Sequence, residues 1–352
     1  MIYIVSKGNK VTGGPETLHQ LGCLLTQKGY QVSMYYDDPH ICAIPERYQQ
    51  YMKKVADQIV DNEDNLIIVP ETMTGLLKNF KYAKICIWWL SLDFFNRTTP
   101  QEIVKWRMKE HQLPKVLYPF VFLFFQVTGK FKEINKGEKY QFDDNGRYFH
   151  LYNCDYARDF LFLHQIQPGK VLYLCGPLNK SYKEQIGKFS IENRENIVLY
   201  NPKKGRAFTT QLIKAAQKTK LKAKFIPLQN MQPDEIVNLM KHAKLYMDFG
   251  DFPGPERIPR EAVIMGCNII TSKNGSAGNT TDVPIPDQFK FETKSGNIHL
   301  ILMCIERMLS EYQNDVSCFD VYRKKVMEQY PMFEKNAIVL LEKVDYHEEN
   351  KI

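Results

Sequence analysis

The chain has 352 residues, which is too long for one ordinary hydrophobic core and predicts two domains of about 150 residues each. With 44% hydrophobic and 25% charged residues, its composition is that of an ordinary globular protein. The net charge of +7 favours anionic partners, but the sequence lacks the arginine-rich tracts and the aromatic and basic repeats of nucleic-acid-binding proteins. We therefore expect no nucleic-acid partner.

The cysteines and the first residues indicate the compartment. The eight cysteines never form a C-x-x-C pair and lie mostly in apolar runs, so we expect free thiols in a reducing environment rather than disulfides or a zinc site. The start "MIYIVSKGNK" has neither the basic region nor the cleavage site of a signal peptide. We therefore expect a cytoplasmic protein.

Strand-like and helix-like segments alternate through the first half of the chain. Strands are predicted at 1–6, 31–37, 65–71 and 83–91, and helices over 15–30 and 45–60. The first helix places Leu18, Leu21, Leu24 and Leu25 on one face and ends at Gly29. This alternation predicts a parallel, doubly wound sheet.

The longest apolar run is "VLYPFVFLFFQV" at 116–127. Its 12 residues, interrupted by Pro119, are fewer than the roughly 20 that a membrane span needs. We expect a buried strand pair or another core segment here. The alternative is a membrane-facing patch, because the basic segment "GKFKEINKGEK" follows directly.

The alternation restarts at 170–176. Strands are predicted within 196–205 and at 222–228, 244–250 and 268–272, and helices over 208–219, 233–243, 259–265, 296–313 and 319–345. We expect a first domain over 1–165, a second domain over 166–318, and a C-terminal helix within 319–352 that packs back on the first domain. Doubly wound sheets bind ligands beyond the carboxyl ends of their strands, so the loops there are the candidate sites.

The segment "GNKVTGGPETLHQ" follows the first strand. Gly13 and Gly14 allow the backbone to approach a ligand closely, Pro15 suits a first helical turn, and Glu16 lies near the positive helix end. The spacing is not G-x-G-x-x-G, so it does not predict a dinucleotide site. The alternative is a tight turn without a ligand.

The segment "YNPKKG" follows a strand of the second half. Lys203 and Lys204, on a loop that Pro202 stiffens and Gly205 ends, are suited to hold phosphate oxygens. The alternative is a solvated basic turn. The spacing is not that of a Walker loop.

The segment "PERIPREAVIMG" carries the strongest pattern. Pro259 suits the first position of a short helix, Glu261 would lie in its first turn, and a glycine ends it. The N-terminus of such a helix offers backbone N–H groups to an anion, and Arg257 and Arg260 add donors suited to phosphate. Glu261 is suited to accept from two ribose hydroxyls. The alternative is a capping glutamate beside solvated arginines.

The next loop, "KNGSAGNTTD", offers small residues and backbone amides, among them Gly275 and Ser276, to another part of a bound sugar phosphate. His150 is a candidate general base, with a structural histidine among aromatic residues as the alternative. Cys154 lacks the partners of a catalytic nucleophile. Asp248 and Asp251 flank a glycine but form no clear metal motif.

The order of these motifs resembles that of the two-domain GT-B glycosyltransferases, especially the retaining, sugar-nucleotide-dependent enzymes. The shared features are a glycine turn and a glutamate after the first strand, a "KG" after a strand of the second domain, and "REAVIMGCNIITSKNGSA". The segments "IWWLSLDFF", "LYNPKKG" and "DFGDFPGPERIPREA" are also similar to bacterial glycosyltransferase-like proteins of surface-polysaccharide clusters. The resemblance implies a GT-B fold, with two Rossmann-like, doubly wound parallel-sheet domains facing a central cleft.

The resemblance also implies roles. Glu261 matches the glutamate that binds the donor ribose, Lys204 the lysine near the diphosphate, and Gly13 and Gly14 the turn that faces donor and acceptor. It implies transfer of a sugar from a UDP- or GDP-sugar to a glycan or lipid-linked glycan acceptor, in surface polysaccharide biosynthesis. No metal or other cofactor would be required. A peripheral position at the inner face of the membrane fits such an acceptor.

The sequence departs from the family at two places. The second glutamate of the retaining enzymes, eight positions before the first, is Pro253 here, and the usual arginine before "KG" has no counterpart. Arg257 or Arg260 is our candidate replacement for that arginine. Retention or inversion at the sugar stays open, as do two other functions: a non-catalytic relative that binds a sugar nucleotide, and a sugar-nucleotide epimerase.

Overall fold

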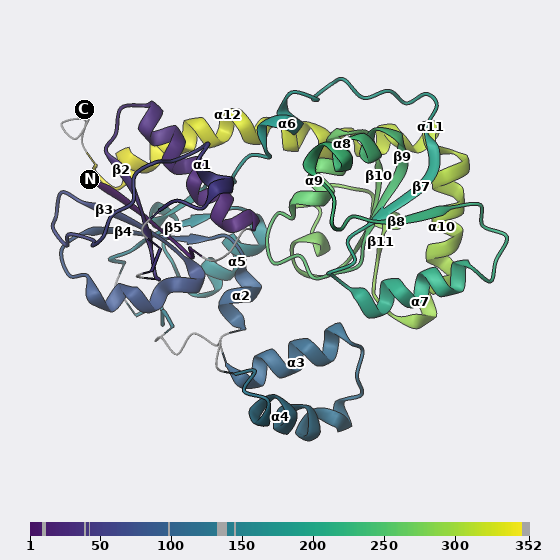
Figure 1. Ribbon diagram of the computed structural model, residues 1–352, viewed down its shortest axis with the longest axis horizontal. Helices are drawn as coiled ribbons and strands as arrows, with labels where there is room; N and C mark the ends of the chain where they lie inside the picture. Colours follow the sequence, from purple (N-terminus) through teal and green to yellow (C-terminus); the bar gives the residue numbers. More distant parts are fainter. Residues whose placement is uncertain are drawn as a thin grey trace. The chain divides into compact units, whose positions relative to one another are not determined.

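The computed structural model describes residues 1–8, 12–38, 40–41, 43–97, 99–131, 139–143 and 146–346. Contacts divide the chain into two compact units (Figure 1). The first contains Met1–Asn96, Asn135–Pro177 and Gln329–Ile352, and the second contains Arg97–Ile134 and Leu178–Glu328. Each unit is built around one parallel sheet, so the predicted pair of α/β domains is confirmed.

The first unit has a six-stranded sheet in the order β2-β1-β3-β4-β5-β6, and every pair of neighbours is parallel. The strands are β1 (Ile2–Ser6), β2 (Val32–Tyr36), β3 (Leu66–Pro70), β4 (Lys84–Trp89), β5 (Phe149–Tyr152) and β6 (Val171–Tyr173). The helices are α1 (Gly13–Gln27), α2 (Leu92–Asn96), α5 (Asp155–Leu163) and the end of α12 (Asp320–Lys343). The strand predicted at 170–176 therefore does not begin the second domain, because β6 pairs with β5.

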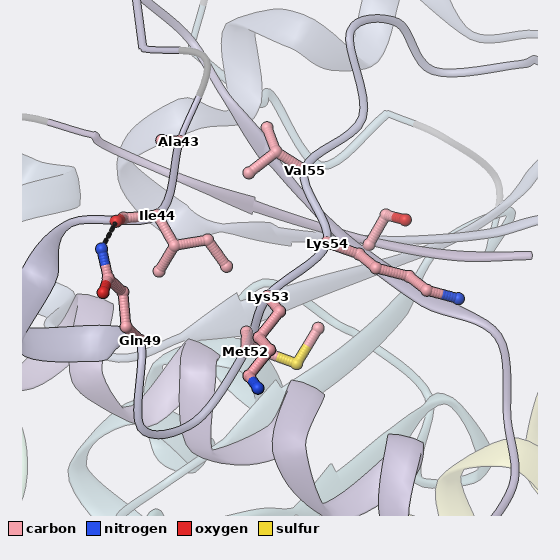
Figure 2. A pocket seen from close by; sticks show the side chains of 8 residues that line it. Ala43, Ile44, Gln49, Met52, Lys53, Lys54 and Val55 are labelled. Carbon is pink, nitrogen blue, oxygen red and sulfur yellow. Dashed lines mark hydrogen bonds between the residues drawn. The ribbon is translucent and has the colours of Figure 1, made fainter.

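The chain after β2 runs along the edge of this sheet. The predicted helix over 45–60 is wrong, because only the single turn Glu46–Tyr48 is helical. Beyond it the chain pairs with β2: the Met34 N–H donates to Lys54 O at 3.0 Å, and the Ala56 N–H donates to Met34 O at 2.8 Å. These bonds satisfy backbone groups that a helix would otherwise pair. A hollow of about 600 Å³ lies beside this segment (Figure 2) and is lined by Ser33, Ala43, Ile44, Gln49, Met52, Lys53, Lys54 and Val55.

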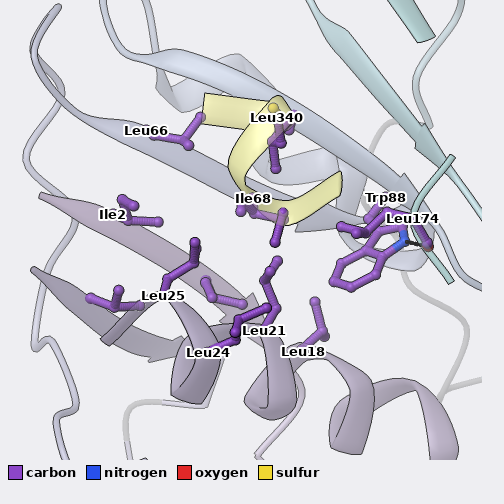
Figure 3. Close-up of a cluster of buried hydrophobic side chains, with 14 of the residues drawn as sticks. Ile2, Leu18, Leu21, Leu24, Leu25, Leu66, Ile68, Trp88, Leu174 and Leu340 are labelled. Atoms are coloured by element: carbon purple, nitrogen blue, oxygen red, sulfur yellow. Dashed lines mark hydrogen bonds between the residues drawn. The ribbon is translucent and has the colours of Figure 1, made fainter. Parts of the chain in front are cut away.

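The first sheet has a hydrophobic core on each face. Ile2 and Ile4 lie in one cluster and Tyr3 and Val5 in the other, as the alternation of side chains along a strand requires. Figure 3 shows the first cluster, in which the Trp88 Nε1–H donates to Leu174 O at 3.0 Å. The cluster includes the four leucines of α1, which confirms the prediction that they share one face of the helix. It also includes Phe333, Ala337, Leu340 and Leu341 of α12.

His19 of α1 is buried in the first unit in its neutral form. Its Nδ1–H donates to Pro15 O at 2.6 Å, and its Nε2 accepts from the Tyr36 hydroxyl at 2.8 Å. The ring stacks on Tyr48 with centroids 4.3 Å apart. Burial lowers the pKa of His19 to about 4, although the Pro15 carbonyl and the Glu16 carboxylate act in the opposite direction.

This histidine predicts that the first unit is sensitive to acid. Between its ordinary pKa of 6.5 and its folded pKa of about 4, the unfolded chain binds more protons, so stability falls as pH drops through this window. From pH 7 to pH 5 the group should remove about 2 kcal/mol of unfolding free energy, and His19→Gln should abolish that part of the slope. Urea unfolding at several pH values measures it. The exposed His299→Gln is the control, and an unchanged slope in His19→Gln would contradict the expectation.

The second unit has a five-stranded parallel sheet in the order β11-β10-β9-β7-β8. The strands are β7 (Glu195–Tyr200), β8 (Lys224–Pro227), β9 (Ala243–Asp248), β10 (Asn268–Ser272) and β11 (Lys290–Phe291). The helices are α6 (Lys180–Lys183), α7 (Arg206–Ala216), α8 (Pro233–His242), α9 (Arg257–Ile264), α10 (Ile298–Ser310), α11 (Tyr312–Asp315) and the start of α12. Except for the short β11, the sequence predicts the strands of this sheet.

The second unit also contains a helical hairpin of α3 (Pro100–Glu110) and α4 (Tyr118–Val127), whose two helices lie side by side (Figure 1). The apolar run 116–127 therefore forms a helix, and the expected strand pair is wrong. The helix is not a buried core segment either, because of its ten residues only Phe125 is buried.

Within the described ranges, no helix combines the length and the apolar character that crossing a membrane requires. Among the described cysteines, Cys86, Cys154, Cys175 and Cys267 are buried, and each described cysteine is a free thiol. Cys42 lies outside the described residues.

Candidate nucleotide-binding site

The order of the strands singles out one place on the second sheet. The strands β7 and β9 are neighbours, and the chain order runs away from them in opposite directions, to β8 on one side and to β10 and β11 on the other. Such a switch point opens a crevice beyond the carboxyl ends of the two strands, where ligands of these folds bind. The loops after β7 and β9 lie there, and both were singled out in the sequence.

Two glycines bring these loops into backbone contact. Gly205 precedes α7 with φ of +55°, and a Cβ on it would lie 2.4 Å from Phe249 O. A Cβ on Gly250 would lie 2.5 Å from the Lys204 Cβ. Only glycine fits such positions, because any side chain would overlap the facing loop. The side chain of Lys204 is thereby held against the loop after β9.

Lys204 is the central cation of this site. Its Nζ forms an ion pair with Glu256 and donates to Asp251 O at 3.4 Å. Burial acts to lower the pKa of Lys204, but the nearby carboxylates, Glu256 first and then Asp248, outweigh it and raise the pKa. Lys204 is therefore a firmly charged, partly buried ammonium group. Lys203, by contrast, is exposed.

Asp248 ends β9 and is buried beneath this lysine. Its Oδ1 accepts from the Gly250 N–H at 2.9 Å, and its Oδ2 accepts from the Tyr246 hydroxyl at 2.9 Å. Burial raises the pKa of Asp248 to about 6, against the opposing effect of Lys204. Among the described residues, no group of three His, Cys, Asp or Glu side chains is placed to hold a metal ion.

Helix α9 follows the loop after β9 and begins two residues earlier than predicted. It starts at Arg257, so Pro259 takes the third position and Glu261 lies in the second turn. A proline is tolerated there because the first four N–H groups of a helix have no partner within it. The predicted end is confirmed, since Gly266 follows the helix with φ of +87°.

Glu261 and Arg260 are buried, whereas the side chain of Arg257 is 29% exposed. Glu261 is buried, and its Oε1 accepts from Arg257 Nε at 3.0 Å and from Arg257 Nη2 at 2.9 Å. Arg260 is also buried, and its Nε donates to Glu256 O at 3.3 Å. The alternative of a capping glutamate beside solvated arginines is therefore wrong for Glu261 and Arg260. Arg257 and Glu261 form a fixed pair on one side of the helix.

The loop after β10 fixes the loop after β9. Gly275 has φ of +59°, and a Cβ on it would lie 2.1 Å from Phe252 O. The Ser276 hydroxyl donates to Gly254 O at 2.8 Å, and its N–H donates to Phe252 O at 2.9 Å. The side chain of Ser276 thus supports the neighbouring loop.

The ion pairs of Asp251 and Glu256 were not predicted from the sequence. Asp251 accepts from Arg97 Nη2 at 3.0 Å and from Lys109 Nζ at 2.8 Å, so the α3–α4 hairpin is bound to the loop after β9. Glu256 lies out of register with the second glutamate of the resembled family, and it takes the role of ion-pair partner instead. The charged residues around Gly250 were the available signal, but their partners are far away in the sequence.

The other candidates lie in the first unit. Gly13 and Gly14 begin α1, and the buried Glu16 accepts from the Tyr51 hydroxyl at 3.1 Å. His150 is fully buried in β5, and its Nδ1 accepts from the Trp89 Nε1–H at 3.1 Å. This burial favours a structural histidine over a general base.

Glu71 is a further carboxylate that the sequence did not single out. It follows β3, at the point where the order of the first sheet reverses between β1 and β3. The carboxylate is buried and accepts from the Leu90 N–H at 2.9 Å. Burial raises the pKa of Glu71 to about 7, although the Leu90 N–H acts to lower it.

No family model matches the sequence, and no curated protein sequence matches it either. Solved structures do match. HepE from Anabaena in complex with UDP has a TM-score of 0.56 at 10% identity and covers 97% of this chain and 99% of its own. Sucrose-phosphate synthase from Thermosynechococcus elongatus has a TM-score of 0.54 at 12% identity, and the match covers 97% of both chains. The lipopolysaccharide outer core galactosyltransferase WaaB has a TM-score of 0.55 at 10% identity, and the match covers 96% of this chain and 99% of its own. Together with the two parallel sheets, these matches over nearly the whole length show that the chain has the GT-B fold.

Proposed function

We propose that the chain is a glycosyltransferase that takes a sugar from a nucleoside-diphosphate sugar and transfers it to a glycan or lipid-linked glycan. The observation that carries the proposal is the charged cluster at the switch point of the second sheet, where Lys204 and the Arg257–Glu261 pair lie on adjoining loops and α9. Solved structures of HepE, which has the same fold, hold UDP and UDP-glucose. UDP- and GDP-sugars are therefore the donors to test first.

Each group has a proposed part in the reaction. Lys204 and the N–H groups at the start of α9 would neutralise the diphosphate as the bond between it and the sugar breaks. Glu261, held by Arg257, would accept from the ribose hydroxyls. Lys203, Gly205, Arg260, Gly275 and Ser276 would shape the donor site, with Gly13, Gly14 and Glu16 on the acceptor side. With this positive charge supplied by the protein, we expect transfer without a bound metal or other cofactor.

We place this reaction in surface polysaccharide biosynthesis, in the cytoplasm and at the inner face of the membrane. A lipid-linked acceptor would explain a membrane position. The second candidate is a relative that binds a sugar nucleotide without catalysis. It is favoured by Pro253, which stands where the retaining enzymes have a second glutamate. Release of the nucleoside diphosphate from a UDP- or GDP-sugar with time would separate an enzyme from such a binder.

Nucleotide binding should be visible as thermal stabilisation. At 100 times its dissociation constant, a nucleoside diphosphate stabilises the folded state by about 2.7 kcal/mol, which corresponds to a shift of several degrees. The panel consists of UDP, GDP, CDP, ADP and CMP. We expect one of these nucleotides to stabilise the wild type, and to do so equally in the presence of EDTA, which removes metal ions. Glu261→Ala should lose most of this shift, because it removes the group assigned to the ribose.

The control is Glu292→Ala, which removes an exposed carboxylate from the same unit. It should leave the nucleotide response unchanged. A panel without any stabilising nucleotide, or an undiminished response in Glu261→Ala, would contradict the assignment.

A further inference from the structure

The outer face of α4 is apolar and largely exposed to solvent. Its side chains recur at the spacing i, i+3, i+4 and i+7, which places them on one side of a helix. They are Val116 just before the helix, 76% exposed, Phe120 at 70%, Leu123 at 58%, Phe124 at 54% and Val127 at 78%. We call these five residues the outer stripe. Isolated exposed apolar residues are normal, but a continuous stripe of this kind marks an interaction surface.

The outer stripe is not the packing face of the hairpin. The opposite side of α4 carries Phe125, which is buried against Val104 and Met108 of α3. Phe122 and Phe131 complete this small core. Helix α4 therefore already has its intramolecular partner, and its outer stripe is left available for another one.

The charges around the outer stripe favour an anionic surface. Between Lys115 and Lys130 the sequence holds no charged residue, so each end of the stripe carries a lysine. The Lys130 Nζ lies 5.0 Å from the centre of the Phe124 ring, so this cation adjoins the stripe. Over residues 97–131 the chain has six Lys or Arg against two Glu, a net charge of +4.

We infer that the outer stripe of α4 docks on the surface of an anionic lipid bilayer. With ten residues the helix is about 15 Å long, half the thickness of a bilayer core, so it would lie in the interface and not cross it. Phenylalanine and leucine side chains would enter the acyl boundary while Lys115 and Lys130 meet the lipid phosphates. The inference rests on the proposed function in one respect: a lipid-linked acceptor would explain why the protein binds a membrane.

The docking surface lies in the unit that holds the candidate donor site. Arg97 and Lys109, from the same hairpin, both bind Asp251 of the loop after β9. A lipid surface held by α4 would therefore be anchored to the donor-binding unit. A lipid-linked acceptor would gain in local concentration there.

Sedimentation with vesicles tests the inference. The full chain should bind vesicles of equal parts phosphatidylglycerol and phosphatidylcholine, and bind pure phosphatidylcholine much more weakly. Phe120→Ser with Phe124→Ser should weaken binding at least about tenfold, because two large apolar groups are removed from the contact. Lys115→Gln with Lys130→Gln should weaken it about fivefold per lysine, and high salt should have the same effect.

The matched control is Leu163→Ser with Val321→Ser, which removes two exposed apolar side chains outside the hairpin. It should bind vesicles as the wild type does. Equal vesicle binding by the wild type and the stripe variant would overturn the inference. So would a wild type that does not bind vesicles but forms a dimer, if the stripe variant is a monomer. Nucleotide stabilisation is measured on the same proteins: a wild type that binds vesicles but that no nucleotide stabilises counts against the proposed function and not against the docking surface.

Discussion

Gly275→Ala is expected to lower the stability of the second unit by about 3 kcal/mol and its Tm by roughly 10 °C. Two effects add. An alanine at φ of +59° is strained, and its Cβ would lie 2.1 Å from Phe252 O and 2.8 Å from Phe252 C. Both are backbone atoms, so no side chain can rotate away, and the loop after β9 would have to shift. Thermal unfolding monitored by circular dichroism measures the loss.

Gly296→Ala is the control for this substitution, because a Cβ there would meet no atom within 4 Å. It should change Tm by no more than a degree or two. The nucleotide response of Gly275→Ala should also fall, since the displaced loop carries Gly250 and the residues before α9. A wild-type Tm in Gly275→Ala would mean that the loops after β9 and β10 do not pack as described.

Much of the fold could be predicted from the sequence because parallel strands buried on both faces appear as short apolar runs. The runs at 1–6 and 268–272 gave β1 and β10 almost to the residue. The same reasoning fails where a run lacks a clear period. The run 116–127 is apolar at nearly every position, so its periodicity does not separate a strand from a helix. The segment 45–60 has the composition of a helix, but the open edge beside β2 offered its backbone an alternative set of hydrogen bonds.

The candidate site could be predicted only in its local parts. Lys204 and Glu261 each stand in a recognisable loop or helix start, so residue type and spacing pointed to them. The partner of Lys204 is Glu256, 52 positions later, and Asp251 is bound by Arg97 and Lys109 from a different part of the chain. Such pairs depend on which strands become neighbours in the sheet. The order β8-β7-β9-β10 cannot be predicted from any single segment of the sequence.

The exact start of α9 could not be predicted from the sequence either. Proline suits either the first or the third position of a helix, because neither N–H would be bonded within it. The sequence therefore allowed a start at Pro259 as well as the observed start at Arg257. The difference of two residues moves Glu261 from the first turn to the second, where Arg257 one turn earlier can bind it.

Lys204→Met is expected to destabilise the second unit by about 2 kcal/mol near pH 8 and to weaken nucleotide binding by about 30-fold. The stability loss follows from removing one partner of a partly buried pair, which leaves Glu256 and the buried Asp248 without their cation. The binding loss is the usual worth of a charge-assisted hydrogen bond to phosphate, about 2 kcal/mol. Lys214→Met, an exposed lysine of α7, is the control and should change neither quantity.

The pH dependence separates this electrostatic account from a loss of packing. Asp248 has a folded pKa of about 6, above its ordinary 3.8, so the folded chain binds more protons between these values and loses stability as pH rises through them. Removing Lys204 should raise this pKa further. The deficit of Lys204→Met should therefore be small near pH 4, where Asp248 is protonated with or without the lysine, and grow up to pH 7 and above. Urea unfolding from pH 4.5 to 8 measures it, and a deficit independent of pH would show that the aliphatic stem of Lys204, rather than its charge, stabilises the loop.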